Sequence, residues 1–284
     1  MGVPEPDGVN ERYADGLAVR EWGDPADPAI LLWPGLGSTG AYFAGIAAAL
    51  PGRALAVDPP GSGRSAPLDR STSDALIELA AGVAEAYGCQ AIVGHSLGAY
   101  VAVGLAADPP AGLRAAVLLD GGFMDAAAMT ELGMPVTSGR EQLIAWMRAN
   151  QLRFPDWETA TRELAGIIGG EPTEMVEAYV RDVFAEVDGE IRERISPEAA
   201  ADQVLAVVEH DVLSRARRVQ VPTLLIASGQ PAELRVIKGR SWRQFTEASP
   251  LIELYVGDAW GHNAIVQDPE ASTRLIVDWL EKHL

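Results

Sequence analysis

Gly94-His95-Ser96-Leu97-Gly98 is the stretch of sequence that decides the fold. It follows the apolar run Ala91-Ile92-Val93 and precedes the largely apolar segment 99–103. This order predicts a strand, a sharp turn with Ser96 at its apex, and a helix, which is the geometry of a nucleophile elbow. The flanking glycines are needed because a side chain at either position would collide with the adjacent strand or helix. The turn exposes the Ser96 hydroxyl, and the helix aims its N-terminal amides at the same place.

Short apolar runs alternate with helical patterns on both sides of the elbow. A helix is predicted over 73–87, because Thr72 suits its start and Gly88 its end. Asp15-Gly16 predicts a hairpin turn before a strand over 17–22. Four runs have an unbroken apolar centre, which is typical of parallel strands covered by helices on both faces; these runs lie within 29–33, 53–58, 90–93 and 115–120. The alternation resumes with strands over 221–227 and 251–256 and helices over 236–248 and 269–283.

Residues 122–215 differ from the rest of the chain. They contain no run that indicates a buried strand, and their amphipathic helical patterns cover 140–152, 156–168, 172–187 and 196–215. We therefore predict a helical cap over an α/β core domain formed by residues 1–121 and 216–284. Four apolar cap residues are candidates to line a pocket over Ser96, although the same spacing also fits ordinary core packing; they are Trp146, Met147, Phe154 and Trp157.

Composition limits the partners and the compartment. The chain has 40 acidic and 22 basic residues in 284, a formal charge of −18, which repels nucleic acids and anionic membrane surfaces. A neutral or cationic small molecule is the better partner. The single cysteine, Cys89, cannot form an internal disulfide, and residues 1–15 carry no signal core, so we expect a cytoplasmic protein. No Cys/His cluster is present, so we expect neither metal nor cofactor. The oligomeric state stays open.

A serine hydroxyl is a poor nucleophile unless a base lies within hydrogen-bond reach and a third group orients that base. Four histidines are available. His95 belongs to the elbow, where the turn directs its side chain away from Ser96; His210 lies in a charged helical stretch; and His283 is the penultimate residue. His262 remains, in a loop after the strand over 251–256. Because loops at the C-terminal edge of a parallel sheet converge, we predict His262 as the general base.

These motifs resemble those of the α/β-hydrolase superfamily over nearly the whole chain, the variable middle excepted. Besides the elbow, the resemblance rests on Trp33-Pro34-Gly35-Leu36-Gly37-Ser38, which is similar to the family's oxyanion loop, and on 58–65, which is similar to its D-x-P-G-x-G-x-S segment. Gly261-His262-Asn263 is the fourth segment. The resemblance implies a mostly parallel sheet of about eight strands, flanked by helices, with a helical cap inserted after Asp120.

The resemblance also implies an oxyanion hole formed by two backbone amides. These amides belong to Leu36 and Leu97. Pro34 stands where the family usually carries histidine, which alters the packing around the Leu36 amide but leaves the amide itself in place.

The acid of the triad has two candidates. Much of the family carries it in a G-x-x-D pattern after the strand predicted here over 221–227, but Ala232 occupies that position. Asp120 ends a buried run, where some relatives, including haloalkane dehalogenases and certain lactone hydrolases, carry the acid. A buried carboxylate needs a partner, because an unpaired buried charge costs several kcal/mol, and His262 would supply one. Glu233, one residue past the usual site, is the alternative.

The predicted chemistry is acyl transfer from a carboxylic ester or lactone to water, with Ser96 as nucleophile and His262 as base. A serine at the elbow counts against the dehalogenase and epoxide hydrolase branches, which attack with an aspartate. We expect a carboxylesterase or lactonase for a small, hydrophobic substrate. A thioesterase, a carbon–carbon bond hydrolase and a cofactor-free haloperoxidase-like enzyme stay open. A small-ligand-binding protein is the non-enzyme alternative, because fold alone does not establish catalysis.

Overall fold

The computed structural model describes residues 10–284 except 15, 70 and 210. Asp15 of the predicted hairpin turn, His210, and most of the N-terminal segment used above to argue the compartment lie outside the described residues. Within the described part of the chain, no helix combines the length and apolar character needed to cross a membrane.

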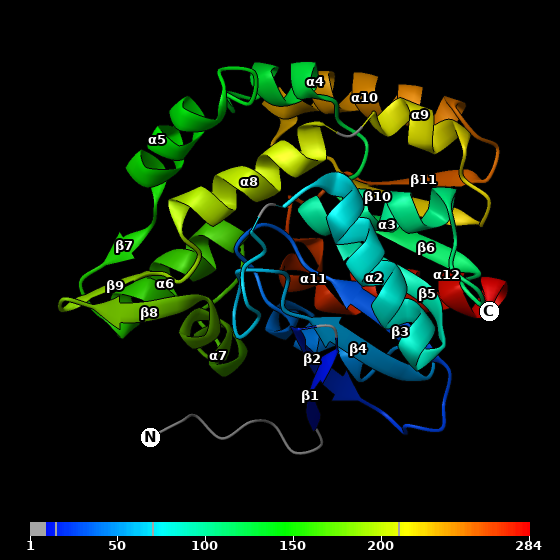
Figure 1. Ribbon diagram of the computed structural model, residues 1–284, viewed down its shortest axis with the longest axis horizontal. Coiled ribbons are helices and arrows are strands. Elements are labelled where there is room, and N and C mark those ends of the chain that lie inside the picture. The colour runs from blue at the N-terminus through cyan, green and yellow to red at the C-terminus, as the bar shows by residue number, and fades with distance from the viewer. Residues whose placement is uncertain (1–9, 15, 70, 210) are drawn as a thin grey trace.

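An eight-stranded sheet runs through the molecule in the order β1-β2-β4-β3-β5-β6-β10-β11 (Figure 1). Its strands are β1 (Asn10–Ala14), β2 (Leu17–Trp22), β3 (Ala29–Trp33), β4 (Arg53–Val57), β5 (Cys89–His95), β6 (Ala115–Leu119), β10 (Thr223–Ser228) and β11 (Ile252–Gly257). From β4 to β11 all neighbours are parallel, whereas β1 and β2 form an antiparallel hairpin that joins β4. The predicted fold class is confirmed.

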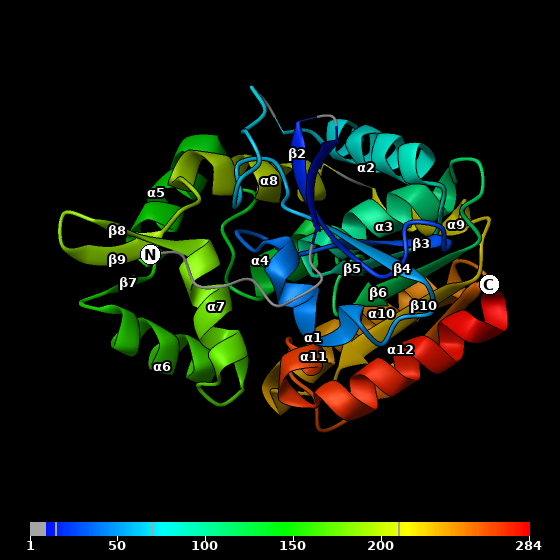
Figure 2. The same cartoon turned by 90° about the horizontal axis from the view of Figure 1, so that it is seen from below.

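Helices cover both faces of the sheet (Figure 2). On one face lie α2 (Ser73–Tyr87), α3 (Leu97–Ala107) and α10 (Arg235–Glu247); on the other lie α1 (Ala44–Ala47), α11 (Ala264–Gln267) and α12 (Pro269–His283). Alternate strand residues supply two separate cores. Leu31 and Trp33 pack with α2 and α3, and Ile30 and Leu32 pack with α12. Burial on both faces explains why β3 reads as an unbroken apolar run.

The ends of two long helices match their predicted positions. The Thr72 Oγ1 atom accepts a hydrogen bond from the Ala75 amide at 3.2 Å, so Thr72 caps α2. Gly88 ends α2 with a left-handed φ of 63°, a conformation that costs glycine little. The last helix, α12, also spans the predicted 269–283.

The chain between β6 and β10, for which we keep the name cap from the sequence prediction, holds the helices α4 (Ala126–Glu131), α5 (Arg140–Asn150), α6 (Trp157–Ile168), α7 (Glu174–Val183), α8 (Pro197–Val208) and α9 (Val212–Arg217). It also holds a three-stranded antiparallel sheet in the order β7 (Arg153–Phe154), β9 (Glu190–Glu193), β8 (Phe184–Val187). The segment expected to be helical therefore also contains short strands, and the helix predicted over 172–187 ends at Val183. These strands are short and mostly exposed, so no apolar run marks them; only Phe154, Phe184 and Ile191 are buried.

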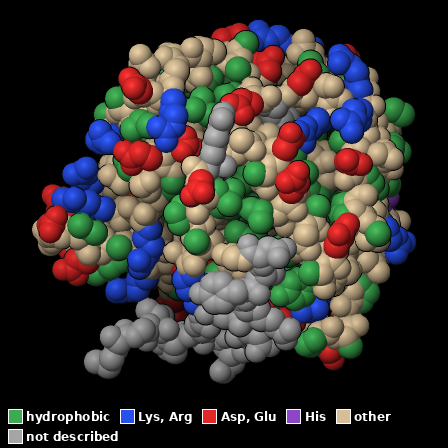
Figure 3. All heavy atoms as spheres, in the orientation of Figure 1, with side chains coloured by type: hydrophobic (Ala, Val, Ile, Leu, Met, Phe, Trp, Pro, Cys, Tyr) green, Lys and Arg blue, Asp and Glu red, His purple; other side chains and the backbone are tan. Residues whose placement is uncertain are grey.

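The outer surface of the cap is rich in charge. Figure 3 shows Lys and Arg side chains gathered over the end of the cap that carries β7–β9, with acidic side chains among them. Arg148 pairs with Glu198 at 2.7 Å and Arg192 with Glu190 at 2.8 Å. At the other end of the cap, α9 runs across the predicted boundary at residue 215 and packs in the main core.

Candidate active site

Ser96 stands at the sharp turn between β5 and α3. Its φ of 55° and ψ of −115° lie outside the regions that residues with a side chain ordinarily adopt, so the turn is strained. A Cβ atom on Gly94 would overlap the backbone of Gly98, and one on Gly98 would overlap the carbonyl group of Trp33. Close packing of strand, turn and helix therefore requires both glycines, as the sequence predicts.

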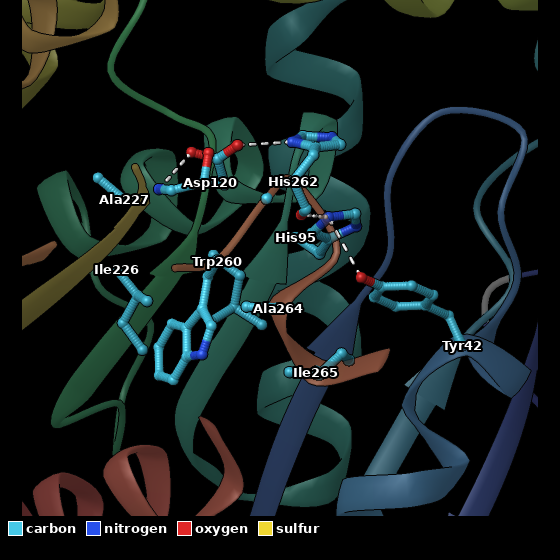
Figure 4. Close-up of a pocket in the computed structure, with 12 residues that line it drawn as sticks. Tyr42, His95, Asp120, Ile226, Ala227, Trp260, His262, Ala264 and Ile265 are labelled. Carbon is cyan, nitrogen blue, oxygen red and sulfur yellow. Dashed lines mark hydrogen bonds and ion pairs between the residues drawn. The ribbon is translucent and has the colours of Figure 1, made fainter. Parts of the chain in front are cut away.

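Three side chains that are distant in sequence meet at this turn. The His262 Nε2 atom lies 2.9 Å from Ser96 Oγ, and His262 Nδ1 lies 2.7 Å from Asp120 Oδ2. Both are hydrogen-bond distances, so the imidazole links the hydroxyl to the carboxylate. The His262 side chain is 49% exposed and that of Asp120 is 5% exposed. The imidazole therefore reaches solvent, whereas the carboxylate that it contacts is buried. Figure 4 shows the contact between Asp120 and His262.

Of the two acids that the sequence left open, Asp120 is the one that contacts His262. Glu233 is exposed in the short 3-10 helix η2 (Ala232–Leu234). The roles of Ser96, His262 and Asp120 in a reaction stay predictions. Their distances fit a nucleophile, a base and an acid that orients the base.

The Asp120 carboxylate is buried among donors. The Ser228 amide donates to Oδ1 at 2.9 Å, and the Lys238 Nζ atom donates to Oδ2 at 2.7 Å. Burial acts to raise the pKa of Asp120, but the hydrogen bonds and charges of His262 and Lys238 hold that pKa well below its usual range. The carboxylate is therefore ionised at neutral pH, as an acid that orients a base must be.

Sequence reasoning missed Lys238. It lies in α10, in a pattern of mixed polar residues that predicts a helix and no site. Only the docking of α10 against β10 turns this ammonium group inward, where it also hydrogen-bonds the Ser228 hydroxyl.

His95 supports the loop that carries His262. Its Nε2 atom donates to the carbonyl oxygen of His262 at 3.0 Å, and its ring stacks on Tyr42 with 4.5 Å between ring centroids. The Tyr42 hydroxyl, in the 3-10 helix η1 (Gly40–Phe43), donates to Asn263 Oδ1 at 3.2 Å. Burial lowers the pKa of His95 to about 3, so this ring is neutral at pH 7. Figure 4 shows Tyr42, His95 and Asp120 around one narrow pocket behind His262.

The backbone around Leu36 and Leu97 lies against the elbow. Leu97 opens α3, and an amide in the first turn of a helix has no acceptor within that helix. The loop that contains Leu36 packs on Ser96 so closely that a Cβ atom on Gly35 would lie 2.9 Å from Ser96 Cβ. Two backbone amides beside a nucleophile are an arrangement that stabilises an oxyanion, and this role of Leu36 and Leu97 stays a prediction.

Helix α7 of the cap holds the same loop through polar contacts. The Tyr179 hydroxyl donates to Ser38 Oγ at 2.9 Å, and the Thr39 hydroxyl donates to Asp182. The cap therefore contacts Ser38 and Thr39, two and three residues after Leu36.

Arg20 of β2 ties this contact to the core. Its guanidinium group lies 2.8 Å from Asp182 and 2.6 Å from Asp58, and the residue is 7% exposed. Asp58 also accepts hydrogen bonds from the amides of Gly40 at 2.9 Å and Arg64 at 3.0 Å. One buried cation thus joins α7 of the cap to Asp58, the first residue of segment 58–65.

The four apolar cap residues divide into two pairs. Phe154 and Trp157 pack in the cap's own core, Phe154 against Phe184 with 5.4 Å between ring centroids. This is the core packing that the sequence left open beside a pocket, with Phe154 in β7 and Trp157 at the start of α6, and a role of either residue in a pocket stays a prediction. Trp146 and Met147 are half-buried on α5 against the main core, and their role in a pocket stays a prediction.

Comparison with known proteins identifies the family. Residues 30–274 match the "Alpha/beta hydrolase family". The chain belongs to the α/β-hydrolase family. The resemblance drawn from its motifs is confirmed, and so is its membership of a family of hydrolases.

Several relatives of this α/β hydrolase have described activities. It is 26% identical over 280 residues to RutD of Klebsiella pneumoniae (strain 342), provisionally named a carbamate hydrolase, with 93% of this chain and 94% of that protein covered. Its structure is similar to E-2-(acetamidomethylene)succinate hydrolase, with a TM-score of 0.77, 23% identity and coverage of 96% and 99% of the two chains. An esterase of Mycobacterium tuberculosis gives a TM-score of 0.73 at 19% identity, with 99% and 94% covered. At these identities the two solved structures show the fold alone.

Proposed function

We propose that this α/β hydrolase is a serine hydrolase that cleaves a carboxylic ester or lactone of a small, hydrophobic molecule. One observation carries the proposal, which is the continuous hydrogen-bonded path from Ser96 Oγ through His262 to Asp120 Oδ2. A path of this kind converts a weakly nucleophilic hydroxyl into one that attacks carbonyl carbon near neutral pH.

The first half of the reaction forms an acyl-enzyme. Ser96 Oγ attacks the carbonyl carbon while its proton moves to His262 Nε2, and the Asp120 carboxylate stabilises the imidazolium without accepting the proton. The carbonyl oxygen becomes an oxyanion, which the amides of Leu36 and Leu97 stabilise. When the intermediate collapses, the bond to the leaving oxygen breaks and His262 returns the proton to that oxygen.

The second half releases the acyl group. Water attacks the acyl carbon as His262 accepts one of its protons, and the proton then moves to Ser96 Oγ when the serine ester bond breaks. The products are a carboxylic acid and an alcohol, or a single hydroxy acid from a lactone. A formal charge of −18 disfavours polyanionic substrates at long range.

A carbamate is the second candidate substrate. The 26% identity to RutD over 93% of this chain favours it. The same serine, base and oxyanion donors act on a carbamate carbonyl, so the site chemistry is shared and the pocket selects between the two classes.

A serine-directed fluorophosphonate and a substrate panel test the proposal. We expect the probe to label Ser96, as identified by mass spectrometry of the modified peptide. We also expect turnover of short p-nitrophenyl esters, or of lactones followed by proton release. Ser96→Ala should lose labelling and lower kcat by about 10⁴-fold or more. Ser138→Ala, at an exposed cap serine, is the matched control and should retain both.

The same panel separates the alternatives. Aryl carbamates turned over at a kcat/KM more than about tenfold above the esters would replace the first candidate with the second. An unlabelled Ser96 together with no turnover of any ester, lactone or carbamate would contradict hydrolysis by this serine. That result would favour a ligand-binding protein on the same fold.

A further inference from the structure

We propose that Lys238 is a positioning residue of this site, a buried cation that holds the Asp120 carboxylate in place and makes the His262 imidazolium less stable than an aspartate alone would make it. The kinetic consequences rest on the proposed function. The electrostatic consequence concerns the resting protein and needs no substrate.

The geometry places two nitrogen donors on one oxygen. The Lys238 Nζ atom and the His262 Nδ1 atom each lie 2.7 Å from Asp120 Oδ2. The other carboxylate oxygen accepts the Ser228 amide at 2.9 Å, and Lys238 also hydrogen-bonds the Ser228 hydroxyl. The side chains of Lys238 and Asp120 are 7% and 5% exposed. Solvent screens this ion pair little, so its charges act strongly on the adjacent imidazole.

The choice of lysine is unusual for this chain. Of the 22 basic residues 20 are arginine, and the other lysine is Lys282. On the same helix, Arg235 and Arg240 are about half exposed and pair with surface acids. A lysine ammonium is a compact point charge on a flexible stem, whereas the planar arginine fork matches a carboxylate edge-on. A compact cation fits beside an oxygen that a histidine already occupies.

Among the described residues, two charged groups face His262 from the elements packed around it. Asp120 follows β6, and Lys238 reaches in from α10. From β5 comes His95, whose ring centroid lies 4.8 Å from that of His262, and burial lowers the pKa of His95 to about 3. From η1 comes Tyr42, whose pKa burial raises well above its ordinary value. Both are neutral near pH 7.

One further ion pair belongs to the same region. Asp258, on the loop after β11, pairs with Arg235 of α10 at 2.7 Å, and the two side chains are 74% and 48% exposed. Exposure screens that pair. The charge on His262 is therefore governed by Asp120, which favours the imidazolium, and by Lys238, which opposes it.

This arrangement has two effects on a general base. The ammonium group fixes the orientation of the carboxylate that in turn orients His262 Nδ1. It also cancels part of the attraction between Asp120 and the imidazolium, because its positive charge opposes a second positive charge on His262.

The test is Lys238→Met, read by NMR titration of the His262 imidazole in a Ser96→Ala background. Removal of the positive charge should raise the titration midpoint by about one pH unit, because the remaining carboxylate stabilises the imidazolium unopposed. With Ser96 restored, the acid limb of the kcat/KM profile should move in the same direction. We also expect kcat on its plateau to fall about tenfold, with KM within about twofold.

Two variants serve as controls. Lys282→Met removes the other lysine, which is exposed on α12, and should leave both the midpoint and kcat unchanged. Lys238→Arg keeps the charge and should keep the midpoint within about 0.3 pH units even where its larger head lowers kcat.

An unchanged midpoint in folded Lys238→Met would overturn the proposal and leave Lys238 a structural role. If that variant does not fold, Lys238→Gln carries the same test, because the amide retains hydrogen bonding without charge. Failure of both neutral variants beside a folded Lys238→Arg would make the cation a folding requirement and would also overturn the proposal. Because the titration uses no substrate, a raised midpoint in a protein that hydrolyses nothing would support this inference while contradicting the proposed function.

Discussion

The carboxyl edge of the central sheet and the cap that covers it are held by different forces. Strands β3, β5, β6 and β10 are almost entirely buried, and Ser96 and Asp120 directly follow two of them. The cap has a small apolar core of its own, an outer surface of exposed ion pairs, and polar links to the oxyanion loop through Tyr179 and Asp182.

This difference suggests that the core serves the chemical step and the cap serves the choice of substrate. Dense apolar packing fixes the backbone to a few tenths of an ångström, which is the precision that a hydrogen-bonded triad needs. Exposed ion pairs each contribute little to stability, so the cap surface can change without moving the triad. We therefore expect substitutions in the core to affect the reaction, and those at the link to the cap to affect its attachment.

If the residues of the core alone orient His262, Asp120→Asn should lower kcat more than any other substitution in this comparison. We expect kcat on the best ester of the panel to fall about 10⁴-fold, because an amide neither holds the required tautomer of His262 nor stabilises the imidazolium. Because Lys238 loses its buried partner in this variant, circular dichroism is needed to verify that the variant is folded. Glu233→Gln should keep kcat near that of the wild type. The opposite result for the two variants would transfer the role of the acid to Glu233.

If a buried cation attaches the cap, Arg20→Met should destabilise the protein more than loss of any single surface pair. Asp58 would remain buried without its cation, which costs about 3–5 kcal/mol of the free energy of unfolding, measured in urea. Arg274→Met removes an exposed pair with Glu270 on α12 and should cost at most about 0.5 kcal/mol. Equal losses in the two variants would show that the Arg20 cluster adds nothing beyond a surface pair.

If the core depends on a neutral His95, stability should fall as the pH drops. The pKa of His95 is lowered from 6.5 to about 3, so between these values the unfolded chain binds a proton that the folded protein excludes. Above pH 6.5 both states leave this histidine largely neutral, so it does not lower the free energy of unfolding. By pH 5 the free energy of unfolding should have fallen by about 2 kcal/mol, because the unfolded chain binds the proton. Urea unfolding of the wild type and of His95→Gln at pH 7 and pH 5 measures this loss. Equal pH dependence in the two proteins would contradict it.

Prediction from sequence succeeded where local rules and the final structure agree. Thr72 and Gly88 mark the ends of α2 because capping and left-handed backbone are decided by neighbouring residues. The elbow was predictable because Gly94 and Gly98 are required by a turn that one short segment builds by itself.

Prediction failed where the deciding contact is made across the molecule. The β8–β9 hairpin carries few apolar residues, so its pattern continued the helix predicted over 172–187. Phe154 lies in β7 and Trp157 opens α6, and their spacing in the sequence left open whether they line a pocket or pack inside the cap.

The amino-acid sequence by itself determined the α/β pattern and the turn that presents Ser96, because glycine placement and apolar periodicity act over short distances. It singled out His262 only by excluding the other three histidines. Only the tertiary structure showed that Asp120, and not Glu233, contacts His262, brought Lys238 against Asp120 and joined the cap to the core through Arg20. The reason is physical. Which charges are paired, and how strongly, depends on distance and burial, and both exist only once helices have docked on the sheet.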